Sequence, residues 1–163
     1  MDITKMLENE EISNYFSVET IAPTKLLVTI KGIKLLSTTA FYENDTEIPL
    51  IKEPYWVYDT YAFNGNQRHT SYVRLKYCSD CPANWSIGIR PVLIIKEKLT
   101  PYTKIKNLLG YDWLVLSDHT LLCNECVIKS AIFNINASCT EYENSLVKTM
   151  LEQWLIGKLT EEN

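Results

Sequence analysis

Glycine and histidine are scarce in this chain. It has five glycines and two histidines, and no stretch matches the glycine-rich loops that cradle phosphate groups or the Gly-x-Ser-x-Gly turn that carries the nucleophile of many hydrolases. The two histidines, His69 and His119, belong to no metal-binding or nucleophile motif. The sequence therefore predicts no catalytic set, and we expect each histidine to have a surface or hydrogen-bonded polar role.

Long apolar runs are missing as well. No segment reaches the roughly eighteen apolar residues of a transmembrane helix, and residues 1–11 are too acidic for a signal peptide. We therefore expect a cytoplasmic protein without a membrane partner. A reducing compartment favours thiols and thiolate metal sites over disulfides.

Basic charge is in the minority. The chain has 16 lysines and arginines against 20 acidic residues, a net charge of −4. Because affinity for nucleic acid depends mainly on basic residues that neutralise phosphates, nucleic acid is not expected as a direct partner. At 163 residues, 46% of them hydrophobic, the chain suits one domain over residues 1–163. The oligomeric state is left open.

The strongest chemical signal is a doubled cysteine spacing. Four of the five cysteines form two Cys-x-x-Cys pairs, Cys78 with Cys81 and Cys123 with Cys126. In a tight turn, a two-residue gap lets both sulfurs point at one ion, so two such turns can supply the four thiolates of a tetrahedral zinc site. Because a closed four-sulfur shell leaves no open position, we expect this zinc to be structural.

Two other interpretations of these cysteines stay open. Forty-one residues separate Cys81 from Cys123, and the spacing does not say whether the two pairs share one ion. All four could instead be small apolar residues at strand ends. A thiol–disulfide pair is the third interpretation, although neither motif lies between a strand and a helix as redox motifs do. Cys139 has no partner at such a spacing and is expected to be a buried or half-buried residue outside the site.

Hydrophobic patterning predicts a mixture of strands and helices, and hence an α+β fold. The expected strands span residues 25–31, 55–58, 69–77, 85–95, 111–116 and 120–123, and the fifth and sixth form a hairpin. Each Cys-x-x-Cys pair follows a predicted strand and is placed in a turn. Helices are expected at 3–16 and 140–155, and residues 96–110 look like a polar connector.

Two groups of short motifs carry a resemblance. The first comprises WLVLSDHTLLC at 113–123, Phe133-Asn134 and YENSLVKTMLEQWL at 142–155; the second comprises GIKLLS at 32–37, YWVY at 55–58 and GIRPVLI at 88–94. The first group resembles the front half, and the second the back half, of a poorly characterised bacterial and phage domain family related to C-type-lectin-like and formylglycine-generating-enzyme folds.

The resemblance implies a single C-type-lectin-like domain with mixed and antiparallel strands and flanking helices. The part that resembles the family's back half comes first, so the chain looks circularly permuted, with residues 96–110 bridging the two half-motifs. The cysteines that formylglycine-generating enzymes use do not match a motif here, so the resemblance brings no activity.

Aromatic residues are abundant, with ten tyrosines and four tryptophans. The tryptophans are expected in the core; they are Trp56, Trp85, Trp113 and Trp154. Residues 55–63 are so rich in rings that some should reach the surface, and aromatic side chains dominate interface energetics. Tyr58, Tyr61 and Phe63 are therefore the predicted partner-binding residues.

Together these observations favour a non-enzymatic protein-binding module with a structural zinc site. The phage and bacterial resemblance points to an inhibitor of a host defence protein, of an anti-CRISPR or other anti-defence type. One alternative is an enzyme, either a thiol oxidoreductase using Cys78 and Cys81 or a formylglycine-enzyme-like oxidase. Another is a zinc-dependent nucleic-acid-binding protein.

Overall fold

The computed structural model describes residues 15–20, 26–64, 67–138 and 140–162, with side chains for 27–59, 69–138 and 140–161. The chain divides into two compact units, each assembled from separate stretches of sequence. Unit 1 comprises Met1–Lys34, Val92–Asn124 and Glu152–Asn163, and unit 2 comprises Leu35–Pro91 and Glu125–Leu151. In the described part of the chain, strands dominate both units and two α-helices accompany them, which confirms the α+β class. A single domain over the whole chain stays a prediction.

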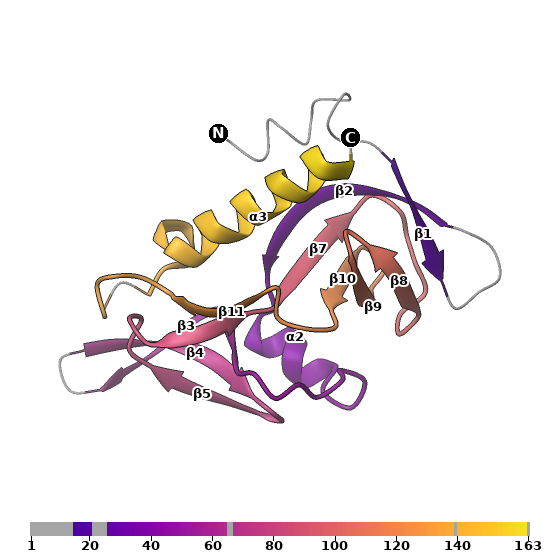
Figure 1. Cartoon of the computed structure of the whole chain (residues 1–163). Helices are drawn as coiled ribbons and strands as arrows, with labels where there is room; N and C mark the ends of the chain where they lie inside the picture. Colours follow the sequence, from indigo (N-terminus) through magenta and orange to yellow (C-terminus); the bar gives the residue numbers. More distant parts are fainter. Residues whose placement is uncertain (1–14, 21–25, 65–66, 139, 163) are drawn as a thin grey trace. The chain divides into compact units, whose positions relative to one another are not determined.

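Unit 1 is built around a closed β-barrel. Its strands are β1 (Tyr15–Thr20), β2 (Leu26–Leu35), β7 (Pro91–Ile95), β8 (Lys104–Leu108), β9 (Tyr111–Ser117) and β10 (Thr120–Cys123). Among the described residues they follow the order β1-β2-β7-β10-β9-β8, and pairing of β1 with β8 closes the barrel (Figure 1). The predicted hairpin at 111–123 is confirmed as β9 and β10.

The barrel core is apolar and centred on Trp113. Leu93, Val115 and Leu121 are buried with it, and the Trp113 indole N–H donates to the carbonyl of Leu108 at 2.8 Å. Burying the indole therefore leaves its polar atom satisfied, as a buried tryptophan requires.

Strand β8 lies inside the segment that the sequence predicts as a polar connector, residues 96–110. Ile105 and Leu108 are its buried residues, and the intervening polar side chains hide this face in the sequence. Leu109 and Gly110 then turn the chain into β9 with φ angles of 55° and 82°, the positive values that tight two-residue hairpins require. This part of the segment therefore belongs to the barrel.

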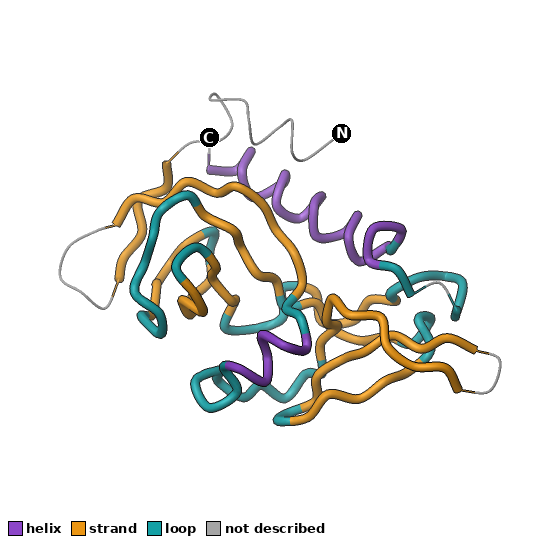
Figure 2. The backbone as a smooth tube through the Cα atoms, turned by 180° about the vertical axis from the view of Figure 1, so that it is seen from behind, coloured by secondary structure: helices purple, strands orange, loops and turns teal. Residues whose placement is uncertain are grey.

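Unit 2 contains an open sheet. Its strands are β3 (Tyr55–Asn64), β4 (Gln67–Arg74), β5 (Tyr77–Cys81), β6 (Ser86–Ile89) and β11 (Ile128–Ile132). Within the described ranges their order is β11-β6-β3-β4-β5, with β3 and β6 parallel and the other pairs antiparallel. Strand β5 is therefore an edge strand. Strands β3 and β4 form a long hairpin, and Figure 2 shows all the strands in orange.

A turn at Leu75 divides the strand predicted at 69–77. Arg74 pairs with Tyr77 across this turn, and Leu75 has a φ of 56°. Apolar and polar residues alternate on both sides of the turn, so the sequence pattern shows no break. The predicted single strand is therefore wrong, and the hairpin carries Cys78 into β5.

Trp56 organises the core of unit 2. Its indole N–H donates to the carbonyl of Ala131 at 2.9 Å, which links β3 to β11. Its ring packs edge-on against Phe133 and Tyr72, with centroid distances of 5.4 and 6.4 Å. Helix α2 (Thr38–Glu43) belongs to the same unit, and Ser37 caps it by accepting a hydrogen bond from the Ala40 N–H at 3.0 Å.

Near the end of the chain, a 3₁₀ turn, η1 (Tyr142–Asn144), precedes helix α3 (Leu146–Glu162). The predicted helix start at residue 140 is too early, because the cap is Ser145, whose Oγ accepts from the Lys148 N–H at 3.0 Å. Of the helix predicted at 3–16, residues 15 and 16 lie in β1 and the rest are outside the described residues.

Candidate functional site

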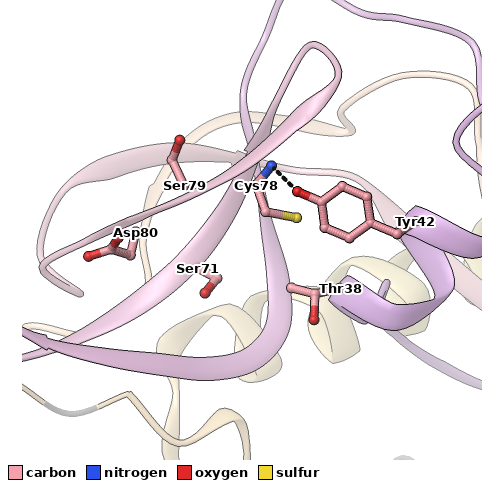
Figure 3. A pocket seen from close by; sticks show the side chains of 6 residues that line it. All are labelled: Thr38, Tyr42, Ser71, Cys78, Ser79 and Asp80. Atoms are coloured by element: carbon pink, nitrogen blue, oxygen red, sulfur yellow. Dashed lines mark hydrogen bonds between the residues drawn. The ribbon is translucent and has the colours of Figure 1, made fainter.

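A polar pocket opens in unit 2, between α2 and the β4–β5 hairpin. Its volume is about 290 Å³. Its lining comes from α2 (Thr38 and Tyr42), β4 (Ser71) and β5 (Cys78, Ser79 and Asp80), as Figure 3 shows.

Strand pairing explains why β4 and β5 present these side chains together. Side chains two residues apart on a strand share a face, and directly paired residues on neighbouring strands share it too. Ser71 pairs with Asp80, and Val73 pairs with Cys78. Ser71, Cys78 and Asp80 therefore lie on one face of the hairpin, together with His69.

Helix α2 supplies the facing wall. The backbone N–H and hydroxyl of Thr38 donate to Oδ2 of Asp59 at 3.3 and 2.5 Å. The hydroxyl of Tyr42 accepts a hydrogen bond from the backbone N–H of Cys78 at 3.1 Å (Figure 3). Tyr42 thereby satisfies an outward-facing donor of the edge strand.

A histidine–carboxylate pair adjoins the pocket. His69 Nδ1 lies 2.7 Å from Asp80 Oδ2, and the histidine is buried while the carboxylate is partly exposed. This agrees with the polar, hydrogen-bonded role expected for His69. No hydrogen bond between described residues joins His69 to Cys78, so the pocket shows no nucleophile–base pair of the kind that thiol hydrolases use.

The Cys78 thiol is electrostatically unsuited to nucleophilic attack. Its burial raises its pKa above the usual range, a hydrogen-bonding contribution from Tyr42 opposes this, and the Asp59 carboxylate raises the pKa further. A thiol is reactive as its thiolate. Cys78 is therefore protonated at neutral pH.

Cys81 lies on the other face of β5. It is buried and pairs across the strands with Thr70, and burial together with Asp80 raises its pKa to about 12. Residues three apart on a strand point to opposite faces, with Cα atoms about 10 Å apart, whereas a disulfide needs about 4.4–6.8 Å. The turn predicted for this pair is wrong, because the chain turns earlier, at Leu75.

The second cysteine pair is divided between the units. Cys123 ends β10 and is buried in unit 1, while Cys126 is buried in unit 2. A Cβ atom on Gly88 would lie 2.7 Å from the Cys126 sulfur, so the thiol packs directly against this glycine. Burial raises the Cys126 pKa to about 11, although Arg90 lowers it. None of these four cysteines forms a disulfide.

A metal-binding group that would match the predicted four-thiolate zinc site is not found among the described residues. In the part of the chain that the structure describes, no group of three or more His, Cys, Asp or Glu side chains is placed to hold a metal ion. The two sulfurs of β5 also face opposite ways. Zinc therefore stays a prediction from the cysteine spacing alone.

Thiol alkylation distinguishes packed thiols from zinc thiolates. In the native protein, iodoacetamide should modify Cys78 first, because it is the half-buried member of the set, and should modify Cys81, Cys123 and Cys126 only on unfolding. The rate of Cys78 alkylation should rise with pH, because the raised pKa of this thiol leaves little thiolate at neutral pH. Peptide mass spectrometry measures each site. If all four thiols were protected in the native protein and a chelator abolished that protection, the zinc site would be established instead.

The predicted aromatic patch lies only partly within the described side chains. Tyr58 is exposed and packs against Tyr142 at a centroid distance of 5.1 Å. The side chains of Tyr61 and Phe63 lie outside the described residues, so their partner-binding role stays a prediction.

The prediction that all four tryptophans lie in the core is confirmed for two of them and wrong for one. Trp56 and Trp113 are fully buried, whereas Trp85 is 53% exposed, in the loop before β6. Trp154 is half-buried and packs against Tyr111.

Most of the residues that line the pocket could not be predicted from the sequence. Thr38 and Tyr42 belong to a six-residue helix, too short for a periodic pattern, although Ser37 is a possible cap signal. Ser71 becomes part of the pocket only through its pairing with Asp80. The sequence predicts a role for Cys78, but as a zinc ligand or as a redox thiol.

The chain matches no protein-family model, no curated protein and no solved structure with which it was compared. No helix in the described part of the chain is long and apolar enough to cross a bilayer.

Proposed function

We propose that this chain is a non-enzymatic protein-binding module. Its binding site is a surface of unit 2 that we call the hairpin surface, made of the pocket together with Tyr42, Leu75 and Tyr77. The observation that carries the proposal is the exposure of these three large side chains, at 50%, 49% and 71%, around an edge strand that also lines a pocket. Tyr42 lines the pocket, Leu75 lies in the turn before β5, and Tyr77 lies on the face of β5 opposite Cys78. Such side chains are the usual anchors of interfaces.

The edge strand adds a second means of recognition. Alternate residues of an edge strand direct their backbone N–H and C=O groups outward. Cys78 does so, because its N–H meets the Tyr42 hydroxyl, and Asp80 follows two residues later. An extended segment of a partner could pair beside Asp80 while its side chains contact the exposed rings.

The backbone at Leu75 supports the same conclusion. Leucine at a φ of 56° occupies the left-handed region, which is unfavourable for most side chains by roughly 1–2 kcal/mol. Leu75 is also half exposed, so it buries only part of its side chain in the fold. Strain of this kind is common where a residue serves binding.

The thiol geometry favours binding over redox chemistry. An oxidoreductase built on Cys78 and Cys81 would need both sulfurs within bonding distance, and β5 directs them to opposite faces. The inhibitor role against a host defence protein, the permuted C-type-lectin-like domain and the structural zinc remain proposals that rest on the sequence.

Peptide display tests the proposal without a known partner. The protein should select peptides that fail to bind a Tyr77→Ser variant, because truncating an interface anchor costs about 2 kcal/mol or more. Trp85→Ser and Ile135→Ser remove two other exposed large side chains, at 53% and 75%, and should retain the peptides. Peptides that bind all variants alike, or that depend on Trp85, would overturn the hairpin surface as the binding site.

Leu75→Asn should separate stability from binding. Asparagine tolerates positive φ better than leucine, so we expect the free energy of unfolding to rise by about 1 kcal/mol while the selected peptides bind at least ten-fold more weakly. Urea denaturation and a binding titration measure the two effects. A variant that is stabilised and binds normally would show that Leu75 lies outside the interface.

A further inference from the structure

The pocket of the hairpin surface carries negative charge at two places. Asp80 lines it directly, and Asp59 lies behind Thr38, close enough to raise the pKa of the Cys78 thiol. His69 contacts one oxygen of Asp80, and a carboxylate has about four lone-pair sites, so Asp80 keeps acceptor capacity toward the pocket.

Basic side chains are missing from the pocket lining and from the sequence around α2. The residues that line the pocket include no lysine or arginine among those described. Residues 35–51 contain Glu43, Asp45 and Glu47 but no lysine or arginine, and these three acidic side chains are exposed. Arg74 and Lys76, at the turned end of the hairpin, do not line the pocket.

Ser71 provides a second, independent sign of a ligand. Its side chain is 3% exposed and lines the pocket beside Asp80 (Figure 3). No described residue is hydrogen-bonded to its hydroxyl. A hydroxyl can both donate and accept a hydrogen bond, and this one lies on the same face of the hairpin as the Asp80 carboxylate.

The size of the pocket indicates an organic group rather than a bare ion. Its volume of about 290 Å³ corresponds to roughly ten water molecules at about 30 Å³ each. This lies at the lower end of ligand pockets, which start at about 300 Å³. One side chain of a partner fits this scale, with its charged end at Asp80 and its alkyl stem against the Tyr42 ring.

We propose that the pocket receives the charged end of a lysine or arginine side chain from the protein that binds the hairpin surface. Asp80 accepts hydrogen bonds from the ammonium or guanidinium, the Ser71 hydroxyl accepts a further one, and Asp59 adds attraction through Thr38. The inference rests on the proposed function and states the chemistry of the partner: a basic residue flanked by apolar ones.

The peptides selected by the hairpin surface provide the probes. Each should contain a lysine or arginine, and replacing that residue with norleucine, which keeps the stem and removes the charge, should weaken binding about ten-fold or more. Asp80→Asn in the protein should weaken binding by a similar factor. Combining the two changes should weaken binding little beyond either alone, because both remove one interaction.

Control variants exclude indirect effects. Asp118→Asn removes a partly exposed carboxylate of unit 1 and should leave binding unchanged. Ser71→Ala should weaken binding of the lysine-containing peptide more than binding of its norleucine analogue. Thermal unfolding should show that every variant is folded. If Asp80→Asn does not fold, the Ser71→Ala comparison decides.

The outcomes separate the two proposals. Peptides that depend on Tyr77 but not on a basic residue would overturn the inference and leave the binding module intact. Peptides that need a basic residue but bind Asp80→Asn and Ser71→Ala normally would place that residue elsewhere and also overturn it. If no selected peptide depends on Tyr77, the proposed function fails and the inference with it.

Discussion

Trp56→Ala should lower the free energy of unfolding by about 3–5 kcal/mol, the range for deleting a large buried ring. Trp56 is fully buried, donates to the carbonyl of Ala131 and packs against Phe133. Its loss would leave a cavity and also remove the donor from a buried carbonyl. Because many domains have a total stability of only about 5–15 kcal/mol, the variant should be close to unfolding at ambient temperature.

Trp85→Ala is the matched control for this prediction. Trp85 is 53% exposed, so its replacement should change the free energy of unfolding by no more than about 0.5–1 kcal/mol. Urea titration of both variants, followed by circular dichroism, compares them directly. Equal losses would mean that Trp85 is buried, as the sequence predicts, and that its place in the structure is wrong.

Gly88→Ala should destabilise the protein by about 1–3 kcal/mol or more, because a methyl group has no room there. An added Cβ would lie 2.7 Å from the Cys126 sulfur and 2.9 Å from the carbonyl oxygen of Pro54. That carbonyl accepts the Gly88 N–H at 3.0 Å, so neither it nor the strand can move without losing a hydrogen bond.

A second change identifies the cause of this destabilisation. Adding Cys126→Ala should recover part of the loss by removing the sulfur, while the clash with Pro54 remains. Gly157→Ala is the contrasting control, because a Cβ in α3 would meet no atom within 4 Å. In a helix this change should stabilise by about 0.5–1 kcal/mol. If Gly88→Ala is as harmless as Gly157→Ala, Cys126 does not pack against β6.

Features that depend on near neighbours in the chain could be predicted. The hairpin of β9 and β10 follows from two short apolar runs on either side of a polar turn. The strand predicted at 85–95 is divided into β6 and β7, and β7 begins at Pro91. In contrast, the turn at Leu75 could not be predicted, because leucine rarely adopts positive φ. That one residue decides that β4 ends and β5 begins.

The candidate site illustrates the same limit. The sequence identifies Cys78 and Asp80 as neighbours in a motif, but it does not place them opposite Ser71 or beneath Tyr42. Those relations come from the register of β4 with β5 and from a hydrogen bond between residues 36 positions apart. A long-range contact leaves no trace in local spacing.

The sequence by itself determined the fold class, the places of strands β2, β3, β9 and β10 and the absence of a recognisable catalytic motif, since composition and local periodicity suffice for these. The tertiary structure decided how the first cysteine pair, Cys78 and Cys81, is arranged. A two-residue gap is compatible with a turn, where both sulfurs can face one ion, and with a strand, where Cys78 and Cys81 face opposite sides of the sheet. Only the pairing of β5 with β4 distinguishes the two, because it holds the segment extended.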